Sequence, residues 1–147
     1  MPRNPWLIAG GVLSLLAAIL HLAVIVGGPD WYRFFGAGEG MAQAAEAGRW
    51  MPVLVTFGIA AVLGLWAAYA FSGAGLIRRL PLMRTALVVI SLIYLLRGLI
   101  VIPLLVRHPE GVDSFGIWSS LIVLVYGIAY AVGTWRAWPV LSKRSAN

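Results

Sequence analysis

Cysteine is absent from this sequence, and charged residues are scarce. Only 11% of the 147 residues are charged, whereas 61% are hydrophobic, and the mean hydropathy is +0.91. A soluble domain carries about 25% charged residues, so a chain of this length would lack the polar surface that water requires. The composition therefore predicts that the lipid bilayer is its solvent. The missing cysteines exclude disulfides, thiol catalysis and cysteine-ligated metals.

Catalytic and cofactor motifs are missing too. The sequence has no HExxH, Walker loop, GxSxG or EF-hand spacing. A metal or haem site built on its two histidines, His21 and His108, would need His108 to fold back from a loop. The formal charge of +6 comes from basic residues at segment ends, without the aromatic and basic pattern of nucleic-acid binding. We therefore expect no cofactor, no metal site and no nucleic-acid partner.

Four apolar runs are each long enough to cross the hydrocarbon core as a helix, which takes roughly 20 residues. They cover residues 6–26, 51–71, 82–106 and 115–135. Glycine and proline separate them; Pro103 is expected to kink or end the third helix, and Pro139 to follow the last. The sequence thus predicts an all-α membrane protein in which residues 1–147 form a single four-transmembrane-helix bundle.

Charges are distributed unevenly between the two ends of these helices. With a cytoplasmic N-terminus, the cytoplasmic segments hold no acid and seven basic residues: Arg3, Arg78, Arg79, Arg84, Arg136, Lys143 and Arg144. The opposite side holds all five acids, Asp30, Glu39, Glu46, Glu110 and Asp113, with only Arg33, Arg49 and Arg107. An excess of basic residues in short loops marks the cytoplasmic side. The pattern predicts a bacterial-type inner (cytoplasmic) membrane protein with both termini cytoplasmic.

The predicted outer loop, residues 27–50, is longer than a turn. Within it, residues 40–47 are expected to form about two turns of helix. The simpler interpretation is a short amphipathic helix on the outer membrane surface, in a segment anchored by Trp31, Tyr32, Phe34 and Phe35. The alternative is a re-entrant segment that covers a cavity between the helices.

Two ionisable residues, His21 and Arg97, lie deep inside the predicted spans, whereas Arg84 is at a span end, and no span contains an acid. Such residues are costly in lipid and usually face the bundle interior or a watery cavity. Arg97 is about 15 Å from Arg107 and about 20 Å from Arg84 along its helix, so water is out of easy reach. Its counter-charge is expected from Glu39, if the outer loop dips inward, and otherwise from Asp30 or Glu46. The alternative is a bound carboxylate, phosphate or lipid headgroup.

Helical spacing places further polar side chains on the inward faces of the spans. The expected ligand-binding cluster lies toward the outer side and comprises His21, Thr56, Tyr94, Arg97, Ser119 and Tyr126, with Glu39 above it. The alternative is that the hydroxyl groups only link helices, through hydrogen bonds that contribute about 0.6 kcal/mol each.

Three classes of function fit these residues. The preferred one is binding or transport of a small anionic or amphipathic molecule through an outward-facing polar pocket. The second is a non-catalytic accessory or assembly subunit of a larger membrane complex, or a homo-oligomer. In the third, a membrane-embedded enzyme acts on a lipid or quinone with His21 as acid or base. Since no second titratable group lies beside it in the membrane, a non-enzymatic role is favoured.

In outline, four helices with a longer first outer loop resemble several small bacterial membrane families, including DoxX-like proteins. No diagnostic motif ties the sequence to one of them. Two other four-helix families are excluded. The chain lacks the cysteines of vitamin K epoxide reductase-like enzymes, and it lacks the glutamate in the first helix of small multidrug transporters.

Overall fold

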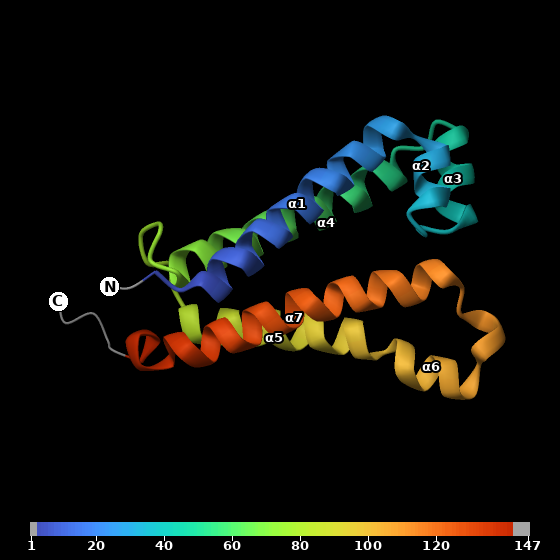
Figure 1. Cartoon of the computed structure of the whole chain (residues 1–147). Helices are drawn as coiled ribbons and strands as arrows, with labels where there is room; N and C mark the ends of the chain where they lie inside the picture. The colour runs from blue at the N-terminus through green and yellow to red at the C-terminus, as the bar shows by residue number, and fades with distance from the viewer. Residues whose placement is uncertain (1–2, 143–147) are drawn as a thin grey trace. The chain divides into compact units, whose positions relative to one another are not determined.

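The computed structural model describes residues 3–142, and every regular element in this part of the chain is a helix (Figure 1). Three long helices are continuous: α1 (Pro5–Gly27), α4 (Met51–Gly73) and α7 (Ser114–Leu141). The third predicted span is divided between α5 (Met83–Leu99) and α6 (Val101–Arg107). These four segments are long and apolar enough to cross a membrane, which confirms the predicted all-α class and the four long apolar helices.

Two compact units make up the described chain. The first unit comprises residues 3–13 and 66–142, which include the start of α1, the end of α4, and all of α5, α6 and α7. The second unit comprises residues 14–65, and it also holds two short helices, α2 (Pro29–Phe34) and α3 (Glu39–Glu46). The helices α1 and α4 thus contribute residues to both units.

In the first unit, α5 and α7 lie side by side (Figure 1). Glycine allows their backbones to approach closely at two places. A Cβ atom added at Gly98 would lie 2.8 Å from the Cα atom of Leu124, and one added at Gly127 would lie 2.9 Å from the backbone nitrogen of Leu95. Small residues commonly permit such contacts between membrane helices. The two glycines therefore set the distance between α5 and α7.

The third span is interrupted at Ile100, between α5 and α6. Proline has no N–H, so Pro103 cannot donate to the carbonyl of Leu99 four residues earlier, and its ring crowds the preceding turn. The next hydrogen bond, from Leu104 N to Ile100 O, is long at 3.4 Å. The kink that the sequence predicts at Pro103 is therefore present, one helical turn earlier. After α6, the 3₁₀ turn Pro109–Gly111 leads into α7.

Pro139 lies inside α7, not after it. The sequence predicts a last span that ends near residue 135, but α7 continues to Leu141. Pro139 cannot donate to the carbonyl of Trp135 four residues earlier, but only residues 140–141 of the helix follow it, so little of α7 lies beyond this break. Arg136 is consequently a helical residue in the last turns of α7.

In the second unit, α2 and α3 pack with the end of α1 around a small apolar core. Val24, Tyr32 and Ala42 are buried together, and the partly buried Phe35, Met41 and Ala45 pack against them. The helix that the sequence predicts over 40–47 is present as α3, one residue earlier, whereas α2 is not predicted.

Tyr32 corrects the expectation that the aromatic residues of this segment all anchor it to the membrane surface. Tyr32 is only 2% exposed, and its hydroxyl oxygen accepts a 3.2 Å hydrogen bond from Oγ1 of Thr56. Phe34, by contrast, is 74% exposed. Tyr32 therefore ties α2 to α4 within the second unit, and only the exposed aromatic residues are left to contact a membrane.

Candidate functional site

Arg97 lies in the last turn of α5, within an apolar helix, and its nearest described partner is a neutral side chain. Its Nη1 atom donates a 3.1 Å hydrogen bond to Oγ of Ser120 on α7, a residue that is only 2% exposed. Within the described part of the first unit, no carboxylate forms an ion pair with Arg97. Ser120 orients the guanidinium group but leaves its charge unneutralised inside this unit.

The two acids of the first unit, Glu110 and Asp113, lie in the connection between α6 and α7. Asp113 caps α7, where its Oδ1 atom accepts a 2.7 Å hydrogen bond from Gly116 N. The carboxylate of Glu110 lies 3.7 Å from Nδ1 of His108. Both carboxylates therefore make local contacts in the segment that leads into α7.

A group of aromatic rings lies one helical turn along from Arg97. Tyr94 contacts the rings of Trp66, Tyr126 and Tyr130 at centroid distances of 4.9, 5.5 and 5.4 Å. The hydroxyl of Tyr130 donates a 3.0 Å hydrogen bond to the carbonyl of Trp66. The structure thus brings together two of the predicted site residues, Tyr94 and Tyr126, and adds Trp66 and Tyr130 to them.

Arg97 forms its hydrogen bond with Ser120 and not with the predicted Ser119. The hydroxyl of Ser119 donates to Gly116 O at 3.2 Å, within its own helix. A heptad pattern could have identified the inward residue, because Ser120, Gly127 and Thr134 recur every seven residues and all three are buried. Residues at this spacing share one face of a helix.

The remaining predicted site residues belong to the second unit, and each has a partner there. Nδ1 of His21 lies 2.7 Å from the carbonyl oxygen of Ala17, so Nδ1 carries the proton that forms this bond. Thr56, which is 5% exposed, donates to Tyr32. These contacts fix the two side chains inside their own unit.

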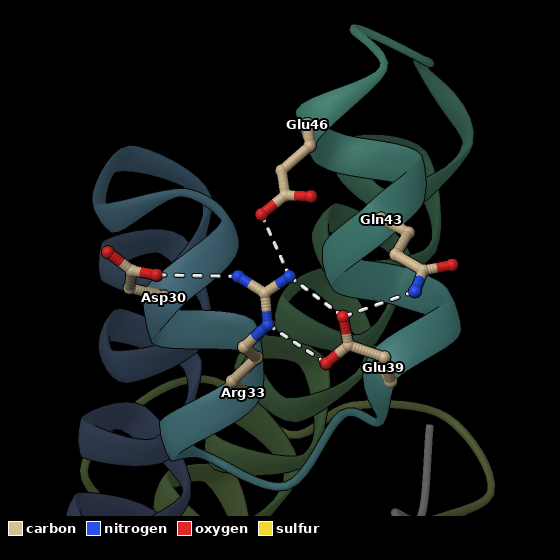
Figure 2. A network of polar contacts seen from close by, with 5 residues as sticks. All are labelled: Asp30, Arg33, Glu39, Gln43 and Glu46. Carbon is tan, nitrogen blue, oxygen red and sulfur yellow. Dashed lines mark hydrogen bonds and ion pairs between the residues drawn. The ribbon is translucent and has the colours of Figure 1, made fainter.

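Glu39 is bound by Arg33 in a polar network that joins α2 to α3 (Figure 2). Nε and Nη2 of Arg33 donate to the two carboxylate oxygens of Glu39 at 2.9 and 2.8 Å. Nη2 also lies 2.8 Å from Glu46, and Nη1 lies 3.4 Å from Asp30. Gln43 donates to Glu39 at 3.3 Å. Both oxygens of the carboxylate expected to neutralise Arg97 are thus occupied by another arginine.

The network shifts the protonation of its members. Hydrogen bonds from Arg33 hold the pKa of Glu39 below its ordinary value, and those to Glu39 and Glu46 raise the pKa of Arg33. Because the pKa of Glu39 is lowered by folding, its stabilising contribution is fully present above the ordinary glutamate pKa, about 4.3. It is lost as the pH falls through the lowered value.

We expect Arg33→Gln to reduce the protection of the α3 amides against hydrogen exchange at neutral pH, because it removes the contacts that hold α3 to α2. In the unmodified protein, the protection factors should fall as the pH drops below the ordinary glutamate value; in the variant they should stay low throughout. Arg49→Gln is the matched control, since Arg49 is exposed and forms no ion pair among the described residues of this unit. Equal protection in both variants would contradict the role of Arg33.

The long apolar helices define the class of this chain, which is an all-helical, multi-pass membrane protein. No protein-family model, curated protein or solved structure matches it. Among residues 3–142, no group of three or more His, Asp or Glu residues could hold a metal ion. The function must therefore be inferred from the side chains of the chain itself. Arg97 is the strongest candidate among them, because it places a charge inside an apolar helix.

Proposed function

We propose that this protein binds or transports a small anionic or amphipathic molecule whose negative group contacts Arg97. The observation that carries the proposal is the pairing of Arg97, inside an apolar helix, with the neutral hydroxyl of Ser120. An arginine in the hydrocarbon region is costly unless it has an anionic or hydrated partner. A bound anion would supply the charge that the first unit lacks.

The geometry of arginine fits a carboxylate or phosphate group. A guanidinium carries five N–H donors in a planar fork, and Ser120 accepts from one nitrogen of Arg97. Such a fork binds carboxylates and phosphates through two parallel hydrogen bonds. Arginine therefore favours an oxyanion over a halide or a neutral alcohol.

The aromatic group beside Arg97 favours a ligand that also has an apolar part. Tyr94, Trp66 and Tyr126 form ring contacts within the first unit, and Tyr94 precedes Arg97 by about 4.5 Å along α5. Aromatic rings offer a large apolar contact area. The proposed site is confined to Arg97, Ser120, Tyr94 and Tyr126.

The charge distribution supports an orientation for this site. With both termini in the cytoplasm of a bacterial-type cell, the basic segments face inward and all five acids face outward. Arg97 then lies in the outer half or the middle of the bilayer, about 15 Å from Arg107. We propose that the ligand enters from the outer side of the membrane.

Thermal unfolding of the full chain in a neutral detergent tests the proposal. Dodecanoate and dodecyl phosphate should raise Tm, because each combines an oxyanion with an apolar chain. Dodecanol, which has the same chain and no charge, should leave Tm unchanged. A shift with dodecanol equal to that with dodecanoate would show that the protein does not recognise the negative charge.

The same observation favours a second candidate, in which the acid that neutralises Arg97 belongs to another protein chain. The protein would then be a non-catalytic subunit of a membrane complex, or would pair with copies of itself. This candidate predicts a stoichiometric protein partner after purification in a mild detergent. The two candidates differ in what dissociates from the protein when Arg97 is replaced. The first predicts the loss of a small molecule, and the second predicts the loss of a partner polypeptide.

A further inference from the structure

A cavity of about 440 Å³ lies in the first unit at the end where α1 begins and where α4 and α7 end. Its polar wall is formed by Arg3, Asn4, Ser72, Arg79 and Arg136. Its apolar wall includes Pro5, Ile77, Met83, Val140 and Leu141. The volume is within the range of small-ligand pockets, about 300–1,000 Å³. This cavity is separate from the proposed site, since Arg97 lies about 20 Å along α5 from Met83.

Hydrogen bonds fix the wall of the cavity on the side of α1. Oδ1 of Asn4 accepts from the backbone nitrogens of Trp6 and Leu7 at 3.2 and 3.3 Å, which caps the start of α1. Nδ2 of Asn4 donates to Gly133 O on α7 at 2.8 Å. The position of Arg3, next to Asn4, is thereby held close to the end of α7.

The opposite wall is fixed by the turn that follows α4. Ser72 donates to Arg78 O at 2.8 Å and accepts from Leu80 N at 3.0 Å, so its hydroxyl bridges this turn. Nη2 of Arg79 donates to Leu141 O at the end of α7, at 2.7 Å. The cavity is therefore built by three segments that are distant in the sequence, residues 3–5, 72–83 and 136–141, and hydrogen bonds link the first two to α7.

The charge of the cavity has one sign. Among residues 3–142, three arginines line it, and no acid does. The two described acids of the unit, Glu110 and Asp113, lie near the start of α7, and Asp113 is about 34 Å from Arg136 along this helix. Within the same described unit, neither Arg3 nor Arg136 forms an ion pair with a carboxylate. An anion bound here would lie among three arginines, with no described acid in the wall of the cavity to compete for them.

We infer that this cavity binds an anionic phosphate group through Arg3 and Arg136, with Arg79 positioned beside them. Arginine binds phosphate oxygens through its planar fork, and basic pockets at the ends of membrane helices bind acidic lipid headgroups. The apolar wall formed by Met83, Val140 and Leu141 suits the glycerol and the first methylene groups of such a lipid. The source of the phosphate is an anionic membrane lipid or free phosphate, and both share the chemistry that the arginines recognise.

Thermal unfolding of the full chain in neutral detergent separates the two sources. If the source is lipid, dioleoyl-phosphatidylglycerol should raise Tm more than dioleoyl-phosphatidylcholine. If the source is free phosphate, millimolar inorganic phosphate should raise Tm, and the two lipids should act alike. If neither phosphatidylglycerol nor inorganic phosphate raises the Tm of the unmodified protein, the inference is overturned.

The double variant Arg3→Gln/Arg136→Gln tests the residues. Each basic residue near an acidic headgroup contributes about 1 kcal/mol, so the double variant should bind phosphatidylglycerol about thirtyfold more weakly. The matched control is Arg107→Gln, an exposed arginine at the end of α6 that does not line the cavity. Equal affinity of the double variant and the control would also overturn the inference.

A measurement on the unmodified sequence covers the case in which the double variant does not fold. Phenylglyoxal, a neutral reagent, modifies accessible arginines. In vesicles, Arg136 should react more slowly with phosphatidylglycerol or phosphate present than with phosphatidylcholine alone, and the rate at Arg107 should not change. Equal protection of the two arginines would contradict a specific site.

Discussion

Arg97→Gln is expected to weaken the binding of dodecanoate by about thirtyfold or more and to abolish its effect on Tm. The removal of one partner from a desolvated, hydrogen-bonded charge pair costs about 2–5 kcal/mol, and 2 kcal/mol corresponds to this factor. Arg97→Lys should give an intermediate affinity, because lysine keeps the charge and loses the planar fork. Isothermal titration in neutral detergent measures both values.

The unfolding of the same variant without ligand distinguishes binding from a purely structural role. If Arg97 mainly links α5 to α7, Arg97→Gln should destabilise the protein by the worth of its hydrogen bond to Ser120, up to about 3 kcal/mol for a charged donor. If the main role of Arg97 is to bind a ligand, the unliganded variant should be as stable as the unmodified protein, because the substitution removes an uncompensated charge from the bilayer. Arg107→Gln should change neither quantity. Undiminished dodecanoate binding by Arg97→Gln would refute the proposed site.

Gly127→Ala is expected to lower the free energy of unfolding by about 1–3 kcal/mol, the usual cost of overpacking. The new Cβ atom would lie 2.9 Å from the backbone nitrogen of Leu95, which cannot rotate away as a side chain can. The helices α5 and α7 would have to separate. Gly98→Ala, which faces the backbone of Leu124, should act in the same direction and also weaken dodecanoate binding, because Gly98 is next to Arg97.

Gly58→Ala is the control for helix propensity. A Cβ atom at Gly58 in α4 meets nothing within 4 Å, so the change should stabilise its helix by up to about 1 kcal/mol, as alanine normally does relative to glycine. The prediction is therefore a reversal of sign between Gly58 and Gly127, measured by unfolding in mixed detergent micelles. The same sign at both positions would contradict the close contact of α5 and α7.

The four long helices could be predicted from the sequence because crossing the hydrocarbon core takes a run of about 20 apolar residues, although α7 continues six residues beyond its predicted end. Local breaks were harder to place. Pro103 disturbs the turn before it, so the interruption falls at Ile100, whereas Pro139 lies two residues before the end of α7 and little of the helix follows it. The break at Ile100 and the position of Pro139 inside α7 depend on backbone hydrogen bonding, and hydropathy carries no information about these bonds.

The site could be predicted only in part, because helical spacing gives a face to within about one residue. That uncertainty explains why Ser120, and not Ser119, contacts Arg97. Tyr32 was missed as a buried residue because the packing of α2 on α1 involves a helix that the sequence does not indicate. The basic cavity joins residues 3, 79 and 136, and no local pattern in the sequence connects them.

Native mass spectrometry of the protein from a mild, neutral detergent tests the central claim most directly. If Arg97 holds an anionic ligand, the unmodified protein and Arg107→Gln should carry an amphipathic adduct of a few hundred daltons that Arg97→Gln lacks. An unmodified protein without an adduct, or an adduct retained in full by Arg97→Gln, would contradict the account. A stoichiometric protein partner lost from Arg97→Gln would instead establish that another chain supplies the acid.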